Sequence, residues 1–164
     1  MKDKIGVDAL RYFLLRDMSF GEDSNYTAEL AISRYNGDLA KNFGNLLNRS
    51  ISMSRKNFEG CVPPLGKIGG LEKELRDLFI KGVKTFQESI LTFQPHRAFE
   101  HALWLSSQVN KYIDRSKPWS LAKDLEEIDR LGTVLYTALD MARILIGLFE
   151  PVMPKKMNEA LNSL

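Results

Sequence analysis

Apolar side chains recur every three or four residues along most of this chain. The period is strongest over residues 124–149, and similar patterns cover 8–17, 28–57, 71–91 and 96–113. Apolar positions at this spacing share one face of an α-helix, and no segment shows the alternation of a half-buried strand. We expect five or six helices, several of them long, joined by short links into an all-α, antiparallel helix bundle.

Turn-forming residues separate these helical patterns. Residues 18–26 contain a glycine and an Asp-Ser-Asn sequence, and Thr27 directly after them is a suitable helix N-cap. Residues 60–70 contain the pairs Pro63-Pro64 and Gly69-Gly70, which interrupt a helix. A further loop is predicted over 114–123.

The two tryptophans receive different predictions. Trp104 lies between two leucines in the middle of a predicted helix, so we expect it in the core. Trp119 follows Pro118 within the predicted loop over 114–123. A proline restricts the backbone before the indole, which reduces the entropy lost when the indole is held in place.

Length and composition indicate one ordinary globular domain. The chain has 164 residues, of which 44% are hydrophobic and 27% charged. Its single cysteine excludes an internal disulfide and favours a cytoplasmic protein. No apolar run approaches the ~20 residues of a membrane span, and no apolar signal segment begins the chain. We therefore expect no membrane partner.

The charges are segregated although the net charge is only +2. Residues 41–67 hold five basic residues and one acid, and residues 109–123 hold four basic residues and one acid. If these two stretches meet in space, they form one basic patch. The alternative is two separate solvated helix faces.

Catalytic and metal-binding patterns are absent from the sequence. His96 and His101 are the only histidines, and neither belongs to a Glu-x-x-His pair. Cys61 lies in the Gly/Pro-rich loop with no identifiable base to activate it. There is no Gly-rich phosphate-binding motif. We therefore predict no catalytic residue and no metal site in this chain.

Three residues favour recognition of a single-stranded RNA loop. Asn45 and Arg49 are four residues apart in a helical pattern, which brings both side chains to one face. Amides and guanidinium groups read base edges, and an indole such as that of Trp119 stacks on an unstacked base. The alternative is that the polar pair is merely solvated and that Trp119 plugs one end of the core.

Several motifs resemble one known family over nearly the whole chain. The sharpest is Asp-Leu-Ala-Lys-Asn-Phe-Gly-Asn-Leu-Leu-Asn-Arg at residues 38–49, and others occur at 6–16, 110–113, 117–123 and 151–154. At these positions the chain resembles the C-terminal anticodon-binding domain of the methionyl-tRNA synthetase family, within the class I aminoacyl-tRNA synthetases.

The resemblance implies roles for particular residues. Asn45 and Arg49 would recognise the first anticodon base, a cytosine, and Trp119 would stack on the unwound anticodon loop. Asn110 and Tyr112 match the family pattern and are expected to shape the loop that carries Trp119. Six residues would support the RNA contact: Asn48, Lys41, Lys111, Arg115, Lys117 and Lys123.

The resemblance also implies a larger parent enzyme. The family's catalytic motifs, His-x-Gly-His and Lys-Met-Ser-Lys-Ser, do not occur here. We therefore expect a fragment in which residues 1–24 form the junction to the catalytic domain and contact the tRNA stem. Residues 25–164 would form the anticodon-binding domain. The parent would use ATP with Mg and methionine, whereas this part would bind no cofactor.

The expected partners are methionine tRNA, through its CAU anticodon loop, and the catalytic domain of the same protein, with no role for DNA. Two alternatives stay open. The chain could be the anticodon domain of another class I synthetase, such as the cysteine or isoleucine enzyme. It could also be a synthetase-derived bundle that binds proteins and no longer binds RNA.

Overall fold

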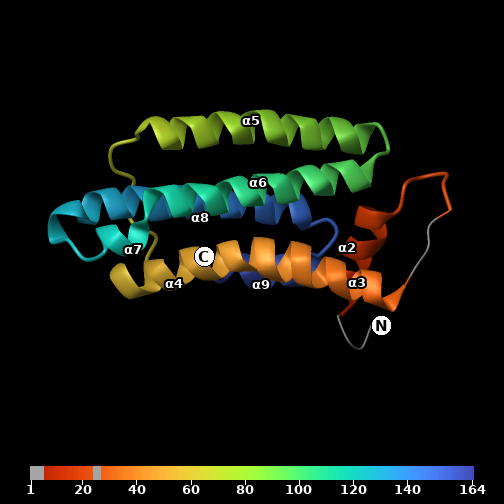
Figure 1. Cartoon of the computed structure of the whole chain (residues 1–164), viewed down its shortest axis with the longest axis horizontal. Coiled ribbons are helices and arrows are strands. Elements are labelled where there is room, and N and C mark those ends of the chain that lie inside the picture. Colours follow the sequence, from red (N-terminus) through yellow and green to blue (C-terminus); the bar gives the residue numbers. More distant parts are fainter. Residues whose placement is uncertain (1–5, 24–26) are drawn as a thin grey trace.

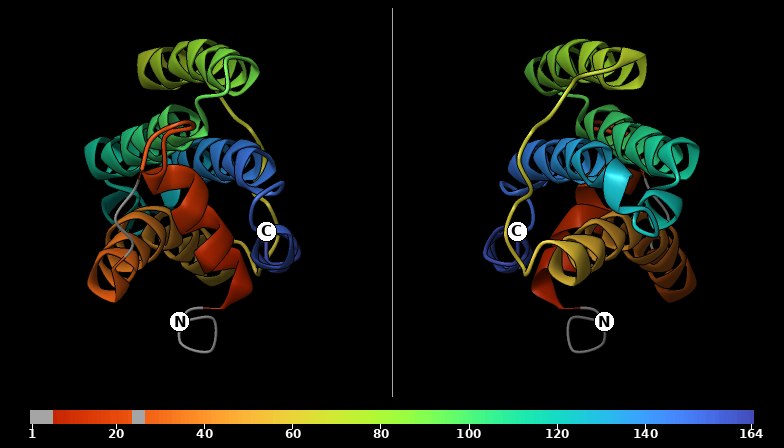
Figure 2. Two further views of the ribbon diagram at one scale, coloured as in Figure 1. Left: turned by 90° about the vertical axis from the view of Figure 1, so that its right-hand side faces the viewer. Right: turned by 90° about the vertical axis from the view of Figure 1, so that its left-hand side faces the viewer.

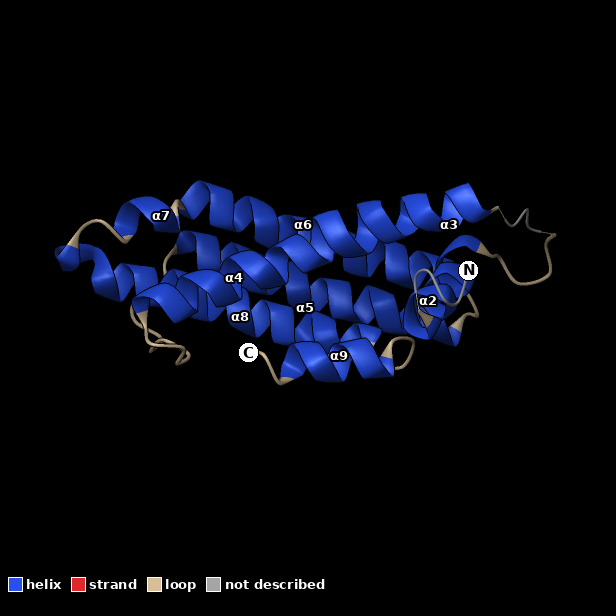
Figure 3. Ribbon diagram, turned by 90° about the horizontal axis from the view of Figure 1, so that it is seen from below, coloured by secondary structure: helices blue, strands red, loops and turns tan. Residues whose placement is uncertain are grey.

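In the computed structural model, every regular element is a helix among the residues described, which are 6–23 and 27–164 (Figures 1 and 3). Residues 1–5 and 24–26 lie outside the described part. They include the start of the expected junction, its boundary at residues 24 and 25, and the end of the loop expected over 18–26. The all-helical fold class predicted from the sequence is confirmed.

The elements in chain order are α2 (Val7–Asp17), α3 (Ala28–Arg34), η1 (Tyr35–Gly44), α4 (Asn45–Asn57), α5 (Gly70–Leu91), α6 (Pro95–Ser116), α7 (Pro118–Leu121), η2 (Leu125–Glu127), α8 (Ile128–Phe149) and α9 (Pro154–Leu161). The predicted helix over 28–57 is a continuous rod whose middle part, η1, is a π-helix. The predicted loop over 114–123 is mostly helical, because α6 continues to Ser116 and α7 follows at once.

The helices form three layers (Figure 2). Helix α5 is the outer layer, α6 and α8 form the middle layer, and the α3–η1–α4 rod, α2 and α9 form the third. Helix α8 is apolar on most of its circumference, and it therefore lies at the centre with Leu131, Leu135, Leu145 and Phe149 fully buried.

The central helix corrects one expectation from the sequence. The helical stretch Leu125–Phe149 is long and apolar enough to cross a membrane, but 67% of its most apolar window is buried inside the bundle. Its apolar character is therefore accounted for by core packing.

Consecutive long helices run antiparallel, as predicted. Because α5 lies between them in the sequence, α4 and α6 run parallel to each other and pack side by side (Figure 1). The connection from α4 to α5 crosses the bundle and is fastened at two points. Ser54 Oγ donates to the Cys61 carbonyl at 2.8 Å, and the Gly66 N–H donates to Thr133 Oγ1 at 3.1 Å.

Aromatic side chains join α2 to the core. The rings of Tyr12 and Phe99 meet edge to face at 6.0 Å, and Phe99 stacks on Phe149 at 5.8 Å. Tyr12 is only 1% exposed, so α2 is an integral part of the bundle. Trp104, in contrast, is 42% exposed, and the prediction that it belongs to the core is wrong.

Candidate nucleic-acid interface

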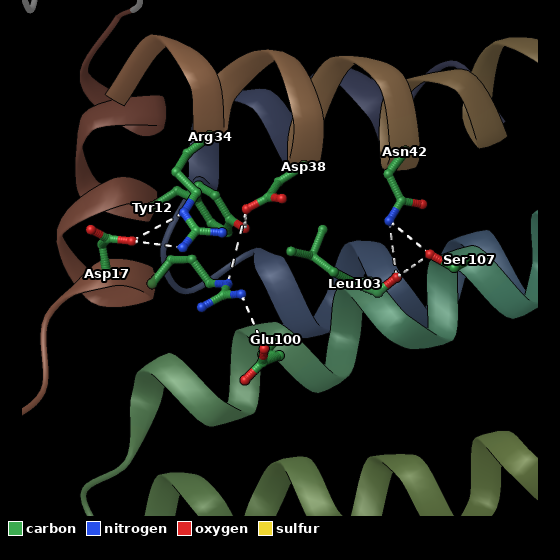
Figure 4. Close-up of polar contacts among 9 residues, drawn as sticks. Tyr12, Asp17, Arg34, Asp38, Asn42, Glu100, Leu103 and Ser107 are labelled. Carbon is green, nitrogen blue, oxygen red and sulfur yellow. Dashed lines mark hydrogen bonds and ion pairs between the residues drawn. The ribbon is translucent and has the colours of Figure 1, made fainter. Parts of the chain in front are cut away.

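The α3–η1–α4 rod carries a polar stripe that faces α6 and consists of Asp38, Asn42, Asn45 and Arg49. The Asn42 side-chain amide donates to the Leu103 carbonyl at 3.1 Å and to Ser107 Oγ at 3.0 Å (Figure 4). Ser106 Oγ donates to Asn42 Oδ1 at 2.9 Å. Asn42 thereby satisfies polar groups between two packed helices, and its role is structural.

At one end of this stripe, Asp38 joins a polar network that fixes α2 to the bundle. Tyr12 Oη donates to Asp38 at 2.9 Å, and Arg16 lies 3.9 Å from Asp38 and 3.5 Å from Glu100 of α6 (Figure 4). Burial, followed by the Asp38 carboxylate, raises the pKa of Tyr12, so its hydroxyl stays protonated and donates. This end of the stripe is therefore engaged in internal contacts.

Asn45 and Arg49 lie at the other end, where the stripe reaches the surface. Asn45 is exposed, and its amide donates to Asn110 Oδ1 at a rather long 3.3 Å. Asn110 is held in turn by donating to the Asn42 carbonyl at 3.2 Å. A long contact to an anchored neighbour orients the Asn45 amide and leaves it accessible to a base edge.

Arg49 is held on two sides. Its guanidinium donates to Asp114 Oδ1 at 2.6 Å and lies 5.7 Å from the centre of the Trp119 ring. Both contacts are attractive, the first an ion pair and the second a cation–π contact. The three residues that the sequence singled out thus come together from α4 and α7, and α6 supplies the carboxylate that pairs with Arg49.

The C-terminal end of α6 and the turn after it expose Trp119. Lys117 adopts the left-handed conformation with φ 46° and closes α6 by donating its N–H to the Ile113 carbonyl at 3.0 Å. Pro118 then occupies the first position of α7, where a missing N–H costs nothing. Pro118 is buried and Trp119 is 44% exposed, so Trp119 is not a core plug.

A buried carboxylate anchors this part of α6 from behind. Glu72 of α5 accepts from Tyr112 Oη at 2.6 Å, from Arg130 at 2.8 Å and from the Gly69 N–H at 2.7 Å. Burial alone would raise the pKa of Glu72, but these hydrogen bonds outweigh it and lower the pKa to about 2. Tyr112 therefore points away from the surface and shapes the site only indirectly.

The supporting residues differ in their surroundings. Arg115 pairs with Glu74 of α5 at 3.5 Å, and Asn48 accepts from Ser52 Oγ at 3.3 Å. The remaining four are exposed lysines without an acidic partner in the described part of the chain: Lys41, Lys111, Lys117 and Lys123. These unpaired charges are available to an anionic ligand.

Sequence reasoning missed the role of Asp114 and of Asn110 as direct partners. Asn110 and Asp114 are four residues apart, as Asn45 and Arg49 are. Each of the first two residues therefore follows its hydrogen-bond partner on α4 by the same 65 positions. Two parallel helices in register produce this pattern. This equal spacing is present in the sequence, but it indicates a contact only when α4 and α6 are known to be neighbours.

No group of three or more His, Cys, Asp or Glu side chains that could hold a metal ion occurs in residues 6–23 and 27–164. The candidate site offers the amide of Asn45, the guanidinium of Arg49, the indole of Trp119 and the ammonium groups of the exposed lysines. These are the groups that bind nucleic acid bases and phosphates.

Comparison with known proteins gives consistent relatives. A family model described as "tRNA synthetases class I (M)" matches residues 1–51. The methionine–tRNA ligase of Caldanaerobacter subterraneus subsp. tengcongensis is 42% identical over 97% of this chain, and that of Clostridium tetani is 38% identical over 98%. The chain spans only about a quarter of the length of these curated relatives (25% of each).

Solved structures agree with the sequence relatives. The free form of Mycobacterium tuberculosis methionyl-tRNA synthetase superposes with a TM-score of 0.92 at 34% identity, covering 98% of this chain and 33% of that one. The same enzyme in complex with methionyl-adenylate gives a TM-score of 0.93.

Fold and sequence together assign the chain to the class I aminoacyl-tRNA synthetases. Within that class it belongs with the methionine–tRNA ligases and corresponds to their helical C-terminal region.

Proposed function

We propose that this chain recognises the CAU anticodon of methionine tRNA through Asn45, Arg49 and Trp119. The observation that carries the proposal is the convergence of these three residues on one exposed edge, with Arg49 at 5.7 Å from the Trp119 ring. An amide, a guanidinium fork and an indole face are the three groups needed to read and stack an unpaired base.

Each residue has a distinct part in this recognition. Arg49 donates to the acceptor atoms of the first anticodon base, a cytosine, and Asn45 complements the same edge with its donor and acceptor. Trp119 stacks on a base of the opened loop, which contributes ~1–3 kcal/mol. Asn48 and the cations Lys41, Lys111, Arg115, Lys117 and Lys123 position the loop through its phosphates without reading sequence.

Asp114 positions Arg49 before RNA binds. Its contact of 2.6 Å keeps the Arg49 guanidinium over the Trp119 ring before RNA arrives. The side chain of Asp114 is 61% exposed, so the ion pair is screened by water and is cheap to rearrange. The guanidinium has enough donors to keep one oxygen of Asp114 while it turns others toward a base.

The proposal extends to the protein of which this chain forms about a quarter. Residues 1–24 would join the catalytic domain and contact the tRNA stem, and residues 25–164 would form the anticodon-binding domain. The catalytic domain would use ATP with Mg and methionine to charge the tRNA in the cytoplasm. In this division of labour, the chain supplies binding energy and specificity, and the chemistry takes place elsewhere.

Titration with two RNA hairpins tests the proposal. One hairpin carries a CAU anticodon loop, and the other differs only in the first anticodon base. We expect tighter binding of the CAU hairpin, with an affinity that falls steeply as salt is added, because phosphate contacts release counterions. Equal affinities would leave only a basic RNA-contacting surface. No binding of either hairpin would favour the alternative of a protein-binding bundle.

A further inference from the structure

The outward face of α6 carries an aromatic and basic strip of which the anticodon proposal uses only Lys111, at one end. Trp104 is 42% exposed, and its ring stacks on His101 with centres 5.2 Å apart and planes 27° apart. From Trp104, Lys111 lies about two helical turns toward the C-terminal end of α6, and Arg97 lies about two turns toward its N-terminal end. Positions 97, 104 and 111 recur every seven residues and therefore share one side of the helix.

The charge of this strip is positive. Neither Arg97 nor Lys111 has an acidic partner in the described part of the chain. The acids nearby on α6 are already paired with cations from other elements, Glu100 with Arg16 and Asp114 with Arg49. The outward side of α6 thus presents free cations beside a large exposed ring.

The strip is continuous with the proposed anticodon site. Lys111 lies directly before the turn of α6 that carries Asp114, and α7 with Trp119 follows the end of the same helix (Figure 1). From Lys111 back to Arg97, the strip extends about 21 Å along the helix axis, at 1.5 Å per residue. It runs from the anticodon site toward the end of the bundle where α2 lies (Figures 1 and 3).

We propose that Arg97, Trp104 and Lys111 bind the sugar–phosphate backbone of the RNA stem that carries the anticodon loop. This inference rests on the proposed function, because the loop bound at Trp119 fixes where its stem begins. Cations contact phosphates, and a flat apolar ring lies against the riboses of a stem, whose base edges are largely out of reach. A strip of this length suits a double-helical stem and exceeds what a loop alone requires.

The chemistry of the His101 and Trp104 pair favours contact with the RNA backbone over a pH-dependent switch. Burial lowers the pKa of His101, so the imidazole is neutral at pH 7 and packs on the indole as an uncharged ring. The cations of the strip are Arg97 and Lys111, and the acids beside them, Glu100 of α6 and Glu74 of α5, pair with Arg16 and Arg115. Contact with the RNA stem is therefore expected to depend on salt and to be insensitive to pH between 7 and 8.

The test uses two hairpins with the same CAU loop, one with a minimal stem and one with a stem long enough to reach Arg97. Trp104→Ala is expected to lower affinity for the long hairpin several-fold and to leave affinity for the short one unchanged. Arg97→Gln should reduce the slope of log K against log salt by about one for the long hairpin only, whereas Lys111→Gln should reduce it for both hairpins, because Lys111 also contacts phosphates of the loop. Lys81→Gln, an exposed lysine of α5, is the matched control and should change neither.

Two results would overturn the inference, and a third would refute the anticodon proposal on which it rests. Equal losses for both stems would mean that Trp104 supports the loop site or the fold, and thermal unfolding of the variants separates these two causes. Unchanged affinities for both stems would leave the strip for a protein partner. If the unaltered protein shows no preference for the CAU hairpin, the anticodon proposal itself is refuted. That preference is measured in the same titrations.

Discussion

Replacing Glu72 by glutamine removes one negative charge from the centre of a buried cluster behind the proposed RNA site. Glu72 is 4% exposed and accepts hydrogen bonds from Tyr112, Arg130 and the Gly69 N–H. The substitution keeps the shape of the side chain. It weakens the bond from Tyr112, and it leaves Arg130 without the carboxylate that it contacts at 2.8 Å.

The magnitude follows from the pKa of Glu72. The carboxyl has a pKa of about 2 in the folded protein and an ordinary value of 4.5. That difference corresponds to roughly 3 kcal/mol of folding stability, since one pKa unit is worth about 1.4 kcal/mol. Because the folded pKa is the lower one, this stability is complete above about pH 4.5 and is lost as the pH falls toward 2.

Urea unfolding followed by circular dichroism measures the effect between pH 2 and 7. At pH 7 we expect Glu72→Gln to lose roughly 2–3 kcal/mol, and the difference from the unaltered protein should vanish near pH 2. Glu74→Gln is the matched control on the same helix, since Glu74 is 59% exposed and its ion pair spans 3.5 Å. It should cost less than about 1 kcal/mol. A pH-independent difference, or none at pH 7, would refute the reasoning.

Two further predictions concern the rod that carries the site and the tryptophan that completes it. A Cβ on Gly44 would meet the Leu39 carbonyl oxygen at 2.8 Å in the π-helix, so Gly44→Ala should lower stability by about 1–3 kcal/mol in thermal unfolding. Gly37→Ala, where a Cβ meets nothing within 4 Å, is the control and should be neutral or slightly stabilising; equal losses would contradict the π-helical geometry. The chain has two tryptophans, so Trp104→Phe leaves Trp119 as the only one. We expect the CAU hairpin to quench its fluorescence by stacking, and an unchanged spectrum at saturation would argue against a stacked Trp119.

The periodic apolar pattern was sufficient to predict the main helical segments and their order, because burial of one face is what stabilises each of them, but it did not predict the short helices α7 and α9. It failed for Trp104. Leu103 and Leu105 on either side of it point to different sides of α6, and Trp104 points outward between them. A residue's sequence neighbours are therefore a poor guide to its burial in a helix.

The sequence predicted that the candidate site residues share a helix face, but it did not predict their hydrogen-bond partners. The spacing of Asn45 and Arg49 placed both on one face, and the structure finds them together on α4. Their partners Asn110 and Asp114 come from a helix 65 positions later, and only the packing of α4 on α6 reveals them. The π-helix η1 was also beyond the pattern, since its wider turn depends on the absence of a Cβ at Gly44.

The most direct test of the central claim is the ratio of affinities for the CAU hairpin and the hairpin changed at the first anticodon base, measured for Arg49→Ala. If Arg49 reads that base, the variant should lose ~1–3 kcal/mol for the CAU hairpin, and the ratio should fall to about one. Arg55→Ala, an exposed arginine further along α4, should keep the ratio. An equal loss for both hairpins, with the ratio preserved, would identify Arg49 as a phosphate contact and contradict the account.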